Sequence, residues 1–212
     1  MGQKKDNDPN HKGATDKAQA ILKGAMQEFL VHGYVATSME RVAAAAGVSK
    51  PTLYSHFQDK ESLFTALVQR LAQEKHGAIF HSPDSYLFQG EPSLVLRHLA
   101  TLILDHLKGE SQLLAFIRLI IGESGRFPEL ARIMVRNIDK PMIERLSQYF
   151  VSRPELQLSD PKTTAQIFIG ALVHFVIIQE MLQSQDILPM ERDRFINNLI
   201  ALIVVDSAVP PK

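Results

Sequence analysis

The sequence contains no cysteine among its 212 residues. A disulfide framework, a thiolate zinc site and a cysteine nucleophile are therefore excluded, and the composition suits a reducing compartment. The N-terminal segment is polar and lacks the apolar stretch of a secretory signal. We expect a cytoplasmic protein whose residues 1–14 form a disordered arm.

The chain also lacks an excess of charge of either sign, since Lys and Arg number 23 and Asp and Glu number 23. Charge alone therefore gives no reason to expect nucleic acid, an anionic membrane or an acidic substrate as partner. Long hydrophobic runs are missing as well. The most apolar run, residues 167–178, includes His174 and is well short of the roughly 20 residues that a membrane-spanning helix needs. We expect a buried helix there and no membrane partner.

Strand patterns are absent too, because no segment alternates apolar and polar residues. Apolar spacing is helical almost throughout, and the 45% apolar content suffices for a sizeable core, so we expect an all-α fold. A first helix follows the apolar face from Ala18 to Leu30 and ends at Gly33. Glycines and prolines within 77–92 mark a domain connection. Later helices are expected near 92–108, 110–123, 128–151, 160–184 and 190–206.

The segment 37–58 has the pattern of two short helices joined by a tight turn. Thr37 and Glu40 form a capping box that begins the first of these helices. Gly47 supplies the left-handed conformation that ends it. Ser49 is the expected N-cap of the next helix, whose first turn tolerates Pro51. These signals predict a helix-turn-helix.

Two further features surround this turn. The run 43–46 is all alanine, and small side chains let two short helices cross closely. The second short helix carries hydrogen-bond donors and one aromatic residue on its exposed side, a mixture that suits phosphates and base edges. These residues are Lys50, Thr52, Tyr54, Ser55 and His56. Asp59 is expected to cap a fourth helix that ends near Gly77.

The sequence resembles the TetR family of bacterial transcriptional regulators over about residues 15–75. The resemblance lies in the segments GYVATSMERVA from Gly33, AGVSKPTLYSHF from Ala46 and DKESLF from Asp59. It implies a three-helix DNA-binding domain at 15–75 with helix 49–57 as recognition helix, and a helical ligand-binding and dimerisation domain at 76–212. The residues that match the family's DNA contacts are Thr37, Lys50, Pro51, Thr52, Tyr54, His56 and Lys60.

Three more residues, Ser38, Arg41 and Ser55, complete the predicted interface with double-stranded DNA. Ser55 stands where many relatives carry a second aromatic residue or a histidine, so one contact is expected to be weaker. The resemblance further implies a repressor of a palindromic operator, released by a small-molecule effector, with no enzymatic activity, cofactor or metal.

The C-terminal helices are rich in apolar and aromatic residues with few polar groups, which predicts a pocket for a largely apolar effector. The candidate lining residues are His98, Phe116, Arg118, Ile120, Phe127, Met134, Phe168, His174, Phe175 and Gln179. Segments 167–178 and 195–205 are apolar on more than one face, which predicts that both pack across a two-fold axis in a homodimer.

Two alternatives stay open. The chain could be an all-α ligand carrier or enzyme, although no convergent pair of titratable groups stands out by spacing. It could also be a TetR-like protein that acts through protein contacts without binding DNA, although Lys50, Tyr54 and Lys60 are all present.

Overall fold

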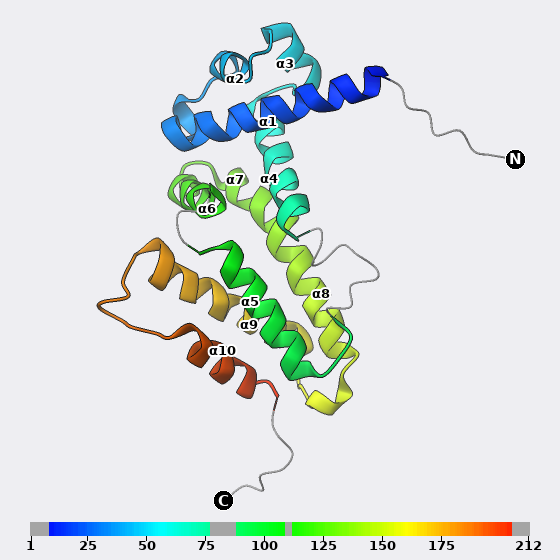
Figure 1. The fold of residues 1–212 in the computed structure, drawn as a ribbon, viewed down its shortest axis with the longest axis vertical. Helices are drawn as coiled ribbons and strands as arrows, with labels where there is room; N and C mark the ends of the chain where they lie inside the picture. Colours follow the sequence, from blue (N-terminus) through cyan, green and yellow to red (C-terminus); the bar gives the residue numbers. More distant parts are fainter. Residues whose placement is uncertain (1–8, 77–87, 109–111, 205–212) are drawn as a thin grey trace, which may run out of the picture. The chain divides into compact units, whose positions relative to one another are not determined.

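The computed structural model describes residues 9–76, 88–108 and 112–204 (Figure 1). Regular structure in these three ranges is entirely helical, which confirms the all-α prediction. The α-helices are α1 (Pro9–Ala36), α2 (Met39–Ala45), α3 (Lys50–His56), α4 (Lys60–His76), α5 (Pro92–His106), α6 (Gln112–Glu123), α7 (Pro128–Met134), α8 (Lys140–Val151), α9 (Pro161–Val176) and α10 (Arg192–Ala201). Two π-helical turns, Val135–Asp139 and Ile177–Met181, and a 3-10 turn, Pro154–Leu156, complete the set.

The chain divides into two compact units. The first unit takes Met1–Arg70 and Leu119–Ile133, and the second takes Leu71–Arg118 and Met134–Lys212. The sequence assigned 119–133 to the second domain, whereas its contacts group it with the first unit. The expected connection at 77–92 lies mostly outside the described residues.

The first unit is organised around α1, beside which α2 and α3 lie (Figure 1). Gly33 breaks α1 near its end with a φ of 77°. The rings of Phe29, Tyr34 and Phe64 form a cluster with centroid separations of 5.5–5.6 Å. Phe127, from the segment before α7, packs 5.2 Å from Tyr34 and ties the 119–133 segment to this core.

Two boundaries differ from the sequence prediction. Helix α1 begins at Pro9, so residues 9–14 are helical rather than part of a disordered arm. The helix expected at 128–151 is interrupted by the π-helical turn Val135–Asp139, which ends two residues before Pro141. Proline has no N–H, and its ring crowds the carbonyl four residues back, here Asn137, so widening the preceding turn relieves the clash.

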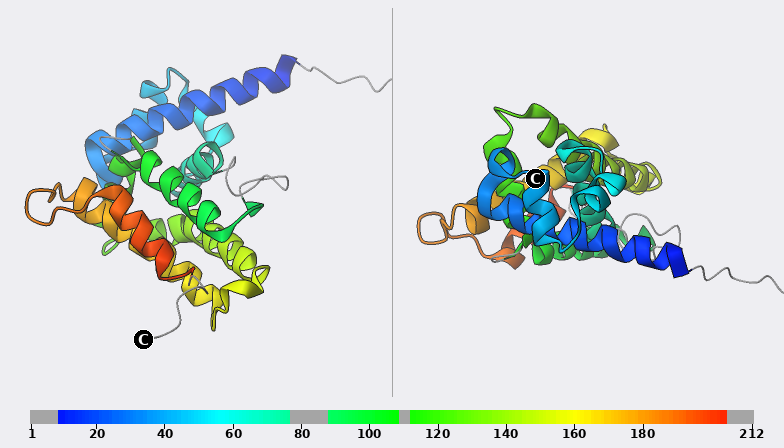
Figure 2. Two further views of the ribbon diagram at one scale, coloured as in Figure 1. Left: turned by 60° about the horizontal axis from the view of Figure 1, so that its bottom comes forward. Right: turned by 90° about the horizontal axis from the view of Figure 1, so that it is seen from above.

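The second unit buries one apolar core among α5, α8, α9 and α10 (Figures 1 and 2). Helix α5 contributes Leu96 and Leu99, and α9 contributes Phe168 and Leu172, all fully buried.

The opposite side of α9 is exposed. By length and composition alone, Pro161–Met181 could cross a bilayer, and 39% of its most apolar window is buried. The buried helix predicted at 167–178 is therefore buried on one side only.

Candidate nucleic-acid interface

Helix α2 begins with a different cap from the one that the sequence predicts. Ser38 is the N-cap, and its hydroxyl accepts a hydrogen bond of 3.2 Å from the Arg41 amide. Thr37 is only 2% exposed, and its hydroxyl lies 3.0 Å from the Glu28 carbonyl and 2.8 Å from that of Gly33. The capping role predicted for Thr37 is therefore wrong. Its buried side chain anchors the start of α2 to α1.

The turn after α2 has the geometry that Gly47 predicts. Gly47 adopts a φ of 65°, and the Val48 amide donates to the Ala43 carbonyl at 3.0 Å. The Gly47 amide donates to the Ala44 carbonyl at 3.1 Å. This pair of hydrogen bonds is the Schellman arrangement, which closes α2 and directs the chain into α3.

The close approach of α1 to the end of α2 depends on Gly24 of α1 rather than on the alanine run 43–46. Ala44 and Ala45 are exposed, and Ala43 is the buried member of the run. A Cβ atom on Gly24 would lie 2.9 Å from the Ala46 nitrogen, closer than packed atoms allow. The sequence carried a signal for this, because a glycine inside a helical pattern costs stability and needs a packing reason.

Helix α3 presents one side to solvent and buries the other through Leu53. As predicted, Ser49 is its N-cap, accepting from the Thr52 amide at 3.2 Å, and Pro51 stands in its first turn. Six predicted DNA contacts come together on or beside its outer side. Lys50, Pro51, Tyr54 and Ser55 are exposed, whereas Thr52 and His56 are half-buried.

Several of these donors already have partners. The Ser55 hydroxyl donates to the Thr52 carbonyl at 2.7 Å, and the Thr52 hydroxyl lies 2.8 Å from that of Ser49. The Lys50 ammonium lies 2.5 Å from Glu40, and this hydrogen bond lowers the pKa of Glu40 and raises the pKa of Lys50. Tyr54 is 42% exposed, and its hydroxyl makes no hydrogen bond to the described residues. Tyr54 is therefore the large side chain best placed to contact a ligand.

Two further residues that the sequence predicts to contact DNA, Arg41 and Lys60, form hydrogen bonds within the protein. Arg41 pairs with Glu28 at 2.8 Å and also contacts the His32 ring. The Lys60 ammonium donates to the carbonyls of Tyr34 at 2.7 Å, Val35 at 3.2 Å and Thr37 at 3.0 Å. Burial lowers the pKa of Lys60. Lys60 thus caps the end of α1.

The ten predicted effector residues are dispersed. Ile120 and Phe127 belong to the first unit, and the other eight to the second. Phe116 and Phe168 are core residues, Met134 is half-buried and His174 is exposed. Arg118 donates to the carbonyls of Glu180 and Met181 at 2.9 and 3.2 Å. This guanidinium, which the sequence predicts to orient an effector, holds the end of the π-helical turn Ile177–Met181.

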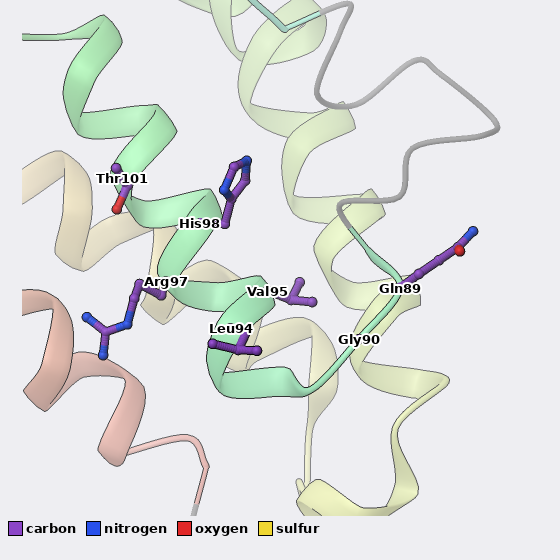
Figure 3. Close-up of a pocket in the computed structure, with 7 residues that line it drawn as sticks. All are labelled: Gln89, Gly90, Leu94, Val95, Arg97, His98 and Thr101. Carbon is purple, nitrogen blue, oxygen red and sulfur yellow. The ribbon is translucent and has the colours of Figure 1, made fainter.

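Two cavities in the second unit contain other predicted residues. Phe175 and Gln179 line a small cavity of about 180 Å³. His98 lines a larger groove of about 660 Å³ at the start of α5 (Figure 3). Leu94 and Val95 give this groove an apolar wall, and Arg97 and Thr101 lie near His98 on the same helix.

Comparison with known proteins agrees with this geometry. Residues 21–67 match the family described as bacterial regulatory proteins, tetR family. Residues 95–205 match the AefR-like transcriptional repressor C-terminal domain. The uncharacterized HTH-type transcriptional regulator YvkB of Bacillus subtilis is 24% identical over 187 residues, covering 87% of this chain and 93% of YvkB.

Two other similar proteins carry more specific names. The HTH-type transcriptional repressor AcnR of Corynebacterium glutamicum is 42% identical over 55 residues, covering 26% of this chain and 29% of AcnR. The structure of the flavonoid-responsive regulator FrrA is 30% identical with a TM-score of 0.65, covering 86% of this chain and 91% of FrrA. The matched ranges and the helix-turn-helix geometry place this chain in the TetR family of bacterial regulatory proteins, as a DNA-binding transcriptional regulator with an AefR-like C-terminal domain.

Proposed function

We propose that the protein is a homodimeric repressor that binds a palindromic operator through α3 and is released by a small, largely apolar effector. The observation that carries the DNA-binding part is the outer side of α3, where Tyr54 and His56 lie beside a partly paired Lys50. The repressor assignment is supported by the name of AcnR, which is 42% identical to this chain over 55 residues.

The DNA contact is tested with a variant of α3 and a control outside it. Tyr54→Ala is expected to weaken operator binding by about 1–3 kcal/mol with an unchanged thermal unfolding midpoint. Gln148→Ala is the control, because Gln148 is exposed on α8 in the second unit and is not among the predicted DNA contacts. Fluorescence anisotropy with labelled duplex measures both affinities. Equal affinity of wild type and Tyr54→Ala would contradict the assignment of α3.

The second candidate function is that of a TetR-like protein which acts through protein contacts and does not bind DNA. Steep loss of binding to random duplex with rising salt is expected for a DNA binder, because each phosphate contact releases counterions. A protein that binds neither random duplex nor heparin at low salt would favour the second candidate.

The homodimer is proposed from the exposed side of α9. Ile167, Gly170 and Val173 lie there at helical spacing, and all three are exposed. A Cβ atom on Gly170 would meet no atom within 4 Å, so a larger side chain fits the protomer.

Gly170→Arg is therefore expected to fold as wild type and to sediment as a monomer at micromolar concentration. Gly122→Arg in α6, also in open space, is the control. A monomeric wild type would overturn the dimer.

We propose the groove at the start of α5 as the effector site. Its volume of about 660 Å³ lies within the range usual for small-molecule pockets. Leu94 and Val95 suit an apolar ligand body, and His98 and Arg97 suit one hydrogen-bonding or acidic group on it.

The name of FrrA makes a flavonoid panel the first probe. An effector is expected to raise the unfolding midpoint of wild type and of Lys162→Ala, an exposed control, but not of Leu94→Asp or His98→Ala. Equal shifts in all four proteins would place the effector elsewhere. Cytoplasmic localisation follows from the proposed role at DNA and is tested by cell fractionation.

A further inference from the structure

Three ionisable side chains meet where α2 packs against the end of α1 (Figure 1). The Arg41 guanidinium, on α2, donates from Nε to the Glu28 carboxylate at 2.8 Å. His32 follows Glu28 by one turn of α1, and its Nε2 contacts a second nitrogen of the same guanidinium, Nη2 of Arg41. The same Nε2 lies 3.7 Å from Oε2 of Glu28, the oxygen that Arg41 already binds. His32 therefore lies between a cation and an anion.

The contact between His32 and Arg41 requires a neutral imidazole ring. A guanidinium has only donors and keeps its charge in proteins, so Nε2 of the ring accepts from it only when Nε2 carries no proton. Histidine is the residue type whose charge changes between about pH 5 and pH 8. A protonated His32 has the same sign of charge as Arg41, and its Nε2 becomes a donor that competes for Glu28. Protonation therefore weakens the hold of α1 on Arg41.

Two other charged groups lie near the end of α1. Glu123 of α6 belongs to the same compact unit, and its Oε1 would lie 3.4 Å from a Cβ atom on Gly33. The Lys60 ammonium of α4 donates to main-chain carbonyls, that of Tyr34 among them. Within the described residues, neither group forms a hydrogen bond or an ion pair with His32. Glu28 and Arg41 are therefore the charges that respond first when His32 titrates.

The Arg41 side chain can leave α1 without a change in the backbone. Its side chain is 47% exposed, and its amide is held separately by the Ser38 hydroxyl, the N-cap of α2. The Glu28 side chain is only 17% exposed, so it stays on α1. A guanidinium binds phosphate with the same planar pair of donors that it offers to a carboxylate. Arg41 can thus exchange Glu28 for a DNA phosphate.

We propose that His32 is a positioning residue which controls the availability of Arg41 to DNA, so that binding tightens as the pH falls. Neutral His32 and Glu28 together hold the guanidinium on α1. Protonated His32 releases it and adds one positive charge to the DNA-binding unit. The inference rests on the proposed DNA contact of Arg41 and concerns the regulation of that contact.

The pH profile of DNA affinity tests this role, because a merely structural role of His32 would not follow its protonation. Labelled duplex of random sequence is titrated by fluorescence anisotropy at pH 8 and pH 5.5, at one ionic strength. The affinity gain at pH 5.5 is expected to be about fivefold larger for wild type than for His32→Gln, with a salt slope larger by about one. Glutamine stays neutral and can accept from Arg41, so the two proteins are expected to bind equally at pH 8.

Two further variants complete the comparison. His106→Gln removes a histidine of the second unit, whose Nδ1 lies 2.6 Å from the Leu102 carbonyl, and is expected to keep the wild-type gain. His32→Lys carries a fixed charge and is expected to bind at pH 8 about as tightly as wild type binds at pH 5.5. Thermal unfolding midpoints at both pH values show whether each variant is folded.

Replacing Arg41 separates positioning from a direct contact of His32 with DNA. In an Arg41→Gln background, the His32-dependent part of the gain is expected to disappear. Its persistence would mean that the imidazolium itself binds DNA and would overturn the positioning role. Equal gains for wild type and His32→Gln would overturn the proposal and leave DNA binding intact. A wild type that binds duplex at neither pH would overturn this inference together with the proposed DNA contact.

Discussion

Lys60 shows that a residue type can be predicted from sequence while its partners within the fold cannot. The resemblance implies a DNA contact, and in the structure the Lys60 ammonium donates to three carbonyls at the end of α1 and lies 4.5 Å from the Tyr34 ring centre. Sequence spacing places Lys60 at the start of α4, but it carries no information on which carbonyls α1 leaves within reach. Arg41, Thr37 and Arg118 follow the same pattern, since each polar group is satisfied inside its own unit.

Replacing Lys60 separates the two roles. Lys60→Met is expected to lower the free energy of unfolding by about 1–3 kcal/mol, because it leaves main-chain acceptors unpaired. The salt dependence of its residual DNA binding is expected to match wild type, whereas loss of a phosphate contact lowers the slope by about one. Urea unfolding and anisotropy at several salt concentrations measure the two effects. Lys23→Met on α1, exposed, is the stability control.

Gly24 gives a second prediction at this scale. Gly24→Ala places a Cβ atom 2.9 Å from the Ala46 nitrogen, a backbone atom that moves only with α2. We expect a loss of about 1–3 kcal/mol in unfolding free energy, which outweighs the higher helix propensity of alanine. Gly122→Ala, in open space within α6, is expected to be neutral or stabilising. A Gly24→Ala protein as stable as wild type in urea would contradict the close approach.

Among the elements, the sequence predicts short helices with clear end signals better than long ones. Ser49, Gly47 and Asp59 act as their residue types indicate, because capping and left-handed turns depend on local chemistry. The π-helical turns at Val135–Asp139 and Ile177–Met181 left no periodic signal. The one-sided exposure of α9 likewise depends on which helices pack against it, which apolar content does not reveal.

Acid sensitivity follows from the N-caps. Hydrogen bonds from the Ser62 amide and hydroxyl lower the pKa of Asp59, the N-cap of α4. Hydrogen bonds from Thr163 and Lys162 likewise lower the pKa of Asp160, the N-cap of α9. A carboxyl whose pKa is lower in the folded state stabilises it above its unfolded pKa, near 3.9, and loses this contribution as pH falls through the folded pKa. Asn also caps helices but does not titrate in this range.

The double variant Asp59→Asn/Asp160→Asn is therefore expected to lose less stability than wild type between pH 5 and pH 3. Urea midpoints at these two pH values measure the difference. Identical losses in the two proteins would show that other groups dominate the acid response.

At the scale of the whole molecule, the chain passes from one unit to the other within three helices, α4, α6 and α7. An effector that favours the released state by about 3 kcal/mol lowers operator affinity roughly a hundredfold. Linkage requires the reciprocal effect, so saturating operator DNA is expected to weaken effector binding by the same factor. Calorimetric titration of effector with and without operator measures this. Effector affinity that is the same with and without saturating operator would exclude this coupling.

The central claim, a dimer that reads a palindrome through two copies of α3, is tested most directly by selecting bound sequences from random duplex DNA. We predict enrichment of an inverted repeat whose half-site centres lie about one helical turn, ~34–36 Å, or somewhat more apart. The enrichment is expected to disappear for Tyr54→Ala and to persist for Gln148→Ala. Recovery of no sequence above the input, from protein that is folded and dimeric, would contradict the account.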